Sequence, residues 1–127
     1  MTNNIPFDFI LDYLHPNDVV TKPMFGCFSL YINNKICFFL RDRDDKKELN
    51  GIWVATSTPA DYESLKKELP SINQDKKLVK DKKSNNKWLL LSVDDNNFEL
   101  LVRKACELVL NNDKRIGKVT KGSLRTE

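Results

Sequence analysis

The spacing of apolar residues along the chain predicts three helices. Positions 7, 10, 11 and 14 are apolar at helical spacing and Pro16 follows them, which predicts a short amphipathic helix. Thr58 can cap a second helix that begins at Pro59 and has its apolar stripe at positions 62, 65 and 69. Apolar residues recur at helical spacing from Phe98 to position 109, which predicts a third and longer helix.

Between these helices the pattern changes to short apolar runs that are typical of strands. Residues 24–32 and 36–40 form two such runs, and Asn33 and Asn34 between them favour a tight hairpin turn, because asparagine tolerates left-handed backbone angles. Residues 51–56 are rich in branched and aromatic side chains and predict a third strand. Residues 78–79 and 88–93 predict a second hairpin with a long basic tip.

These elements predict an α+β fold, with a mainly antiparallel sheet of about five strands and three helices in the order α-β-β-β-α-β-β-α. The chain of 127 residues is long enough for one domain with its own core. We assign that domain to residues 1–113 and predict that residues 114–127 form a basic C-terminal tail.

The hairpin of residues 24–40 is apolar on both faces. A loop at Asn33 and Asn34 predicts that Ile32 faces Lys35, and the same register places two sets of side chains on opposite faces: Phe28, Leu30, Ile32, Cys37 and Phe39, against Cys27, Tyr31, Ile36, Phe38 and Leu40. An antiparallel sheet usually leaves one face in water, so the second set must be covered by helices, by a tail or by another subunit. We therefore expect an interface, with a second copy of the chain or another protein, that includes Tyr31, Ile36, Phe38 and Leu40.

The residues that usually carry catalysis or bind metals are scarce. Cys27, Cys37 and Cys106 are isolated among apolar residues, which is typical of buried thiols and not of a disulfide framework or a zinc site. His15 is the single histidine and the four glycines are scattered, so no nucleophile with a histidine base and no phosphate-binding loop is predicted. We expect no catalytic residue, no metal and no cofactor. An enzyme would need a polar cluster that sequence order conceals, for example a cleft lined by Arg41, Arg43, Trp53 and Tyr31.

The chain carries no sign of membrane insertion or export. The N-terminal residues have neither a basic segment nor an apolar stretch of a signal peptide, and no window approaches the ~20 apolar residues that span a bilayer. We therefore expect a cytoplasmic protein with no membrane partner.

The net charge of +3 hides an asymmetry between the two halves of the chain. Residues 1–63 carry 6 basic and 9 acidic side chains, whereas residues 64–127 carry 15 basic and 9 acidic ones. The excess lies in the second hairpin and the tail, at Lys76, Lys77, Lys80, Lys82, Lys83, Lys87, Lys114, Arg115, Lys118 and Lys121. If these segments lie together, they form a patch that can bind the phosphates of nucleic acid. A solvated face with a solubilising tail explains the same charges, since lysine dominates and no aromatic residue interleaves with the basic ones.

Residues 22–31, with the order Lys-Pro-Met-Phe-Gly-Cys-Phe-Ser-Leu-Tyr, resemble the start of the TfoX N-terminal domain family. Members of that family open their first strand with Met-Phe-Gly, usually after a basic residue and a proline. The matching positions here are Lys22, Pro23, Met24, Phe25 and Gly26, whereas Cys27 and Ser29 stand where typical members have glycine. From the residues themselves we expect a structural role, in which Met24 and Phe25 fill the core and Gly26 permits a bend.

The resemblance covers roughly residues 5–112 and implies the small α+β fold of the family. The best-studied relatives are regulators of competence for DNA uptake in bacteria, and the family offers no catalytic residue to transfer. We therefore expect a non-enzymatic regulatory or protein-interaction module, and the alternative is a nucleic-acid-binding accessory protein that uses the basic hairpin and tail.

Overall fold

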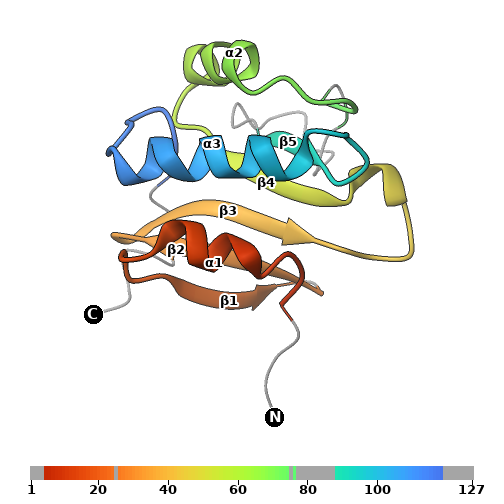
Figure 1. Ribbon diagram of the computed structural model, residues 1–127, viewed down its shortest axis with the longest axis horizontal. Coiled ribbons are helices and arrows are strands. Elements are labelled where there is room, and N and C mark those ends of the chain that lie inside the picture. Colours follow the sequence, from red (N-terminus) through yellow and green to blue (C-terminus); the bar gives the residue numbers. More distant parts are fainter. Residues whose placement is uncertain (1–4, 25, 75, 77–87, 119–127) are drawn as a thin grey trace.

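Five antiparallel strands form one sheet in the order β1-β2-β3-β4-β5 (Figure 1). The computed structural model describes residues 5–24, 26–74, 76 and 88–118. Its strands are β1 (Val20–Met24), β2 (Cys27–Ile32), β3 (Lys35–Arg41), β4 (Gly51–Ala55) and β5 (Trp88–Ser92). Its helices are α1 (Phe9–Leu14), α2 (Pro59–Glu68) and α3 (Phe98–Leu110), with one short 3-10 helix, η1 (Lys47–Leu49). The predicted α+β class, with three helices and a five-stranded antiparallel sheet, is confirmed.

The sheet begins with β1 at Val20, four residues before the apolar run of residues 24–32 that was predicted to be its first strand. Met24 pairs with Cys27, so the run of residues 24–32 divides between β1 and β2. Gly26 has a φ of +78°, a backbone conformation that glycine adopts without strain. The predicted strand at residues 78–79 lies outside the described residues.

The turn between β2 and β3 agrees with the prediction. Asn33 and Asn34 have φ values of 54° and 66°, and Ile32 pairs with Lys35 on either side of them. Two residues with positive φ match the right-handed twist of the flanking strands, which favours a tight hairpin.

A β-bulge then corrects the predicted register of this hairpin. After the Tyr31 pair the register shifts by one residue, so Leu30 pairs with Phe38 and not with Cys37. Cys37 is the extra residue, and both Cys37 and Phe38 join the cluster on the helix-covered side of the sheet. Hydrophobic alternation did not reveal this change because every residue from 36 to 40 is apolar.

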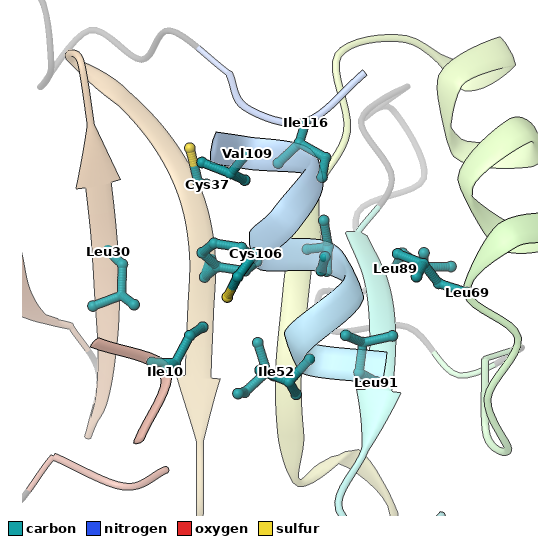
Figure 2. Close-up of a cluster of buried hydrophobic side chains, with 14 of the residues drawn as sticks. Ile10, Leu30, Cys37, Ile52, Leu69, Leu89, Leu91, Cys106, Val109 and Ile116 are labelled. Atoms are coloured by element: carbon teal, nitrogen blue, oxygen red, sulfur yellow. The ribbon is translucent and has the colours of Figure 1, made fainter. Parts of the chain in front are cut away.

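The first face of the sheet is the face that α1 and α3 cover (Figure 1). Figure 2 shows Ile10 of α1 and Cys106 of α3 near sheet residues such as Leu30 and Ile52. Leu69, which follows α2, packs at the β5 side of the same core. Helix α2 starts as predicted, because Thr58 Oγ1 accepts a hydrogen bond from the Asp61 N–H at 3.1 Å.

The second face of the sheet is also buried. One cluster on it contains Cys27, Phe39, Leu49, Trp53 and Leu90, and another contains Tyr31, Ile36 and Ala55. Trp53 is fully buried, and its indole N–H donates to the Leu49 carbonyl at 2.9 Å, so the η1 turn is held on this face. Cys27 and Cys37 lie on opposite faces, as predicted.

Residues 114–118 belong to the folded domain, which corrects the predicted boundary at residue 113. Between the ends of β3 and β4, Ile116 bridges to Thr56, and Lys118 bridges to Ile36. Lys118 and Ile36 exchange both main-chain hydrogen bonds, at 2.9 and 3.0 Å. Ile116 is 4% exposed and enters the helix-side core beside Val109 (Figure 2). The first residues of the predicted tail are therefore a structural part of the sheet, and residues 119–127 lie outside the description.

Candidate interaction surface

The predicted interface on the hairpin is buried within the chain. Tyr31 and Ile36 lie on the second face and are only 8% and 4% exposed. Phe38 and Leu40 lie on the first face and are fully buried, because the bulge turns them toward the helices. The prediction that these four residues contact a second molecule is therefore wrong.

Strand β1 is one edge of the sheet, and β2 is its only strand partner among the described residues. Met24 pairs with Cys27, only three positions along the chain, and this spacing makes it a hydrogen-bonded position, so the backbone groups of Lys22 and Val20 also point toward β2. The N–H and C=O of Thr21 and the C=O of Pro23 consequently point away from the sheet. Pro23 is compatible with this position because the N–H that it lacks would have faced outward.

The side chains along β1 make this edge partly apolar. Val20 and Lys22 pair with Tyr31 and Ser29 and therefore share the second face. Val20 is 53% exposed, more than any other large apolar side chain described. The Lys22 Nζ lies 4.8 Å from the centre of the Tyr31 ring, a cation–π contact that holds the lysine stem against the sheet.

The opposite edge of the sheet, at β5, is closed by side chains. Gln74 Nε2 donates to the carbonyls of Leu90 at 3.1 Å and Leu69 at 2.7 Å. Ser71 Oγ accepts a hydrogen bond from the Ser92 N–H at 2.9 Å. Free strand edges invite pairing with another chain, and native proteins commonly cover them. In the described part of the chain, the β5 edge is covered and the β1 edge is not.

Gly26, the last of the motif residues Lys22 to Gly26, lies next to Arg43. A Cβ atom on Gly26 would lie 2.7 Å from Arg43 Nη1, so glycine permits the close approach of this guanidinium. Arg43 Nε in turn contacts Asp45 Oδ1 at 2.8 Å. Gly26 thus has a structural role at the hairpin, whereas the side chains of Met24 and Phe25 lie outside the description.

Of the four residues named as an example of a cleft, Arg41 and Arg43 take part in a loop-holding network, and Tyr31 packs apart from Trp53. Arg41 is 6% exposed, and its guanidinium donates to Asn50 Oδ1 at 2.7 Å and to the carbonyls of Lys46 and Asp45, both at 3.1 Å. Asn50 also bonds the backbone of Arg43, so this network holds the loop between β3 and β4. Tyr31 packs in a different cluster from Trp53.

The three cysteines are free and buried, as predicted. Burial raises the pKa of Cys37 to about 11 and that of Cys106 to about 12, and it also raises the pKa of Cys27. A thiol must ionise to act as a nucleophile or a metal ligand, so these environments oppose both roles near neutral pH. Within the described ranges, no group of histidine, cysteine, aspartate and glutamate side chains is arranged to hold a metal ion.

Lys35 and Lys118, here called the lysine cluster, lie at the C-terminal bridge that residues 116–118 form with the sheet. The Lys118 Nζ is 4.8 Å from the centre of the Trp88 ring, and the Lys35 side chain packs against Gly117, 3.2 Å from the position of a Cβ there. Lys118 is half-buried, and desolvation lowers the pKa of its ammonium to about 8. The structure thus brings a lysine and an aromatic ring together, which residue order alone did not reveal.

The other basic residues of the predicted patch differ in exposure and in ion pairing. Lys76 and Lys114 are exposed. Arg115 is engaged by two carboxylates, Glu68 and Asp113, each at 2.7 Å, which raise the pKa of its guanidinium. The remaining predicted contacts lie outside the described residues: Lys77, Lys80, Lys82, Lys83, Lys87 and Lys121.

The structure is thus a small α+β domain in which β1 has a strand partner on one side only, among the described residues. Comparison with protein-family models, with curated proteins and with solved structures found no match to this chain. In the part of the chain that the structure describes, no helix has both the length and the apolar character needed to cross a bilayer.

Proposed function

We propose that this protein is a small non-enzymatic interaction module that binds an extended segment of a partner polypeptide along β1. The difference between the two edges of the sheet carries the proposal. Side chains of Ser71 and Gln74 satisfy outward groups of β5, whereas no described residue forms a hydrogen bond with the outward groups of Thr21 and Pro23. Pairing of a partner strand with these groups is the recognition mode known as strand addition, in which main-chain bonds supply affinity and side chains supply specificity.

The surroundings of β1 support a short and selective contact. Pro23 offers a C=O but no N–H, so a partner strand gains little by extending past this residue. Val20 supplies an apolar contact and Lys22 a cation on the same face. The buried polar residues Arg41, Asn50 and Gln74 are engaged in holding loops, which favours a binding role over catalysis. The resemblance of residues 22–31 to the TfoX N-terminal domain family supports a regulatory use of such binding.

A displayed library of random octapeptides, selected on the immobilised full-length protein, tests this proposal. Selected peptides should bind the Thr21→Ala variant with unchanged affinity, because that change keeps the main-chain N–H. The Thr21→Pro variant removes the outward N–H and should weaken binding at least tenfold, while circular dichroism verifies that it is folded. Equal binding to both variants would show that the peptides bind elsewhere and would refute the role of β1.

A second candidate, a nucleic-acid-binding accessory protein, is favoured by the lysine cluster. No described carboxylate forms an ion pair with Lys35, Lys114 or Lys118, in contrast to Arg115. A phosphate would compensate the half-buried charge of Lys118, and Trp88 could stack on a base.

Fluorescence anisotropy with labelled single- and double-stranded DNA at two salt concentrations tests this candidate. Each lysine that contacts a phosphate contributes about 0.9 to the slope of log K against log salt on duplex DNA. Lys118→Gln should lower that slope by about this amount, whereas Lys104→Gln on the exposed side of α3 should not. An unchanged slope for Lys118→Gln would contradict the candidate.

A further inference from the structure

We infer that the partner strand at β1 is β1 of a second copy of the chain, so that the two sheets join edge to edge around a twofold axis. The inference rests on the proposed function, because it names the occupant of the same edge. It differs from the hairpin-face dimer that the sequence predicted, since that face is buried. The argument depends on which antiparallel register the residues of β1 allow.

One register satisfies the backbone, the apolar residue and the charges together. Pairing Thr21 with Val19 of the second copy lets each pair exchange both main-chain hydrogen bonds. The same register places Val20 against Val20 of the second copy, which covers the most exposed large apolar side chain described. It also places Lys22 directly opposite Asp18 of the second copy, and both side chains are at least partly exposed in the single chain. Opposite charges at facing positions stabilise an antiparallel pair.

The pairing has a natural limit at each end. Beyond the Thr21 pair, Pro23 would face Asn17 of the second copy. Pro23 has no N–H to donate, and the Asn17 N–H already donates to the Leu14 carbonyl at 2.9 Å. The contact is therefore short, and we expect a weak dimer.

Two antiparallel registers displaced toward the C-terminus of β1 give less favourable hydrogen bonds or facing charges. Moving the twofold axis one residue toward the C-terminus of β1 pairs Thr21 with itself but opposes Lys22 to Val20 and leaves a Val19 carbonyl without a donor, because Pro23 faces it. Moving the axis by two residues opposes Lys22 to Lys22 of the second copy, and like charges at facing positions are destabilising. The proline and the charges thus disfavour these two registers, and proteins commonly control edge strands in this way.

Sedimentation velocity of the full-length protein, from about 10 μM to about 1 mM, tests the inference over the range expected for a weak interface. We expect a concentration-dependent dimer. Lys22→Asp and Asp18→Lys should each shift the dissociation constant upward at least tenfold, since each places like charges opposite one another. The double variant that carries both changes should restore dimerisation. Lys104→Asp, which makes the same charge change on exposed α3, is the control and should dimerise as the wild type does.

Amide hydrogen exchange by NMR locates the contact in the same samples. The Val19 and Thr21 amides should exchange more slowly as concentration rises, whereas the Val20 and Lys22 amides should be protected at every concentration. A protein that stays monomeric at about 1 mM would overturn the inference. If selected octapeptides still bind β1 in that case, the proposed function stands without it. A dimer that is indifferent to the charge changes and leaves Thr21 exchange unaltered would also overturn the inference, because it would use another surface.

Discussion

Replacement of Ile116 by alanine tests whether the C-terminal bridge is part of the fold. Ile116 is 4% exposed and lies in the same core cluster as Cys37 and Val109 (Figure 2). The change removes most of a buried aliphatic side chain and leaves a cavity at the end of α3. Substitutions of this kind cost about 2–5 kcal/mol, depending on how well the site can collapse. We expect a value of about 2–3 kcal/mol, because Ile116 lies at the border of the core.

Urea unfolding, followed by tryptophan fluorescence and by circular dichroism, measures this loss. With a urea dependence of about 1–3 kcal/mol per molar for a small protein, the midpoint should fall by roughly 1–2 M. Lys114→Ala is the matched control, because this residue of the same segment is exposed and the Ser57 hydroxyl contacts only its backbone carbonyl, at 2.8 Å. Its effect should stay within about 0.5 kcal/mol. Equal stabilities for the wild type and Ile116→Ala would mean that residues 114–118 behave as a tail after all.

Three further changes test the buried network, the corrected hairpin face and the titration of the lysine cluster. Asn50→Ala leaves the buried Arg41 guanidinium without its side-chain acceptor and should lower the free energy of unfolding by about 2–4 kcal/mol in urea titrations, whereas a loss below about 0.5 kcal/mol would contradict the network. Phe38→Lys should abolish the folded circular dichroism spectrum at every protein concentration, because Phe38 is fully buried. If this variant is instead a folded monomer, Phe38 is a surface residue and the hypothesis of an interface on the hairpin face stands again. The pKa of Lys118 is about 8 in the folded protein, below its value of 10.5 when exposed, so between these pH values the unfolded state binds more protons and the contribution of Lys118 to stability rises with pH. The free energy of unfolding of the wild type, minus that of Lys118→Met, should therefore increase from pH 8 to pH 10 and stay constant below pH 7, and a flat difference would refute the half-buried charge.

Helix positions were the most predictable part of this fold. The apolar spacing from Phe98 predicted α3 to within a residue of its end at Leu110, and Thr58 with Pro59 predicted the start of α2. These signals are local, because a helix forms its backbone hydrogen bonds within itself and needs only one apolar stripe to pack on the core. The hairpin turn at Asn33 and Asn34 was predictable for the same reason, since its geometry depends on two residues.

The candidate site was much less predictable. Nothing in the order of residues shows that β1 ends the sheet while Ser71 and Gln74 cover the opposite edge, because these contacts join segments far apart in the chain. The bulge at Cys37 was hidden for a different reason. When neighbouring residues are all apolar, a shift of one position changes which side chains face the helices without changing the pattern.

The order of residues was enough to predict the class of the fold, the burial of the three cysteines and the tight turn of the hairpin. Each of these follows from periodicity or from the backbone preferences of single residues. Three features became visible only in the folded chain: the second sheet face is covered, Ile116 and Lys118 pair with the sheet, and β1 is its uncovered edge among the described residues. These outcomes depend on main-chain pairing between distant segments, and main-chain groups are the same in almost every residue, so the side-chain pattern carries little information about them.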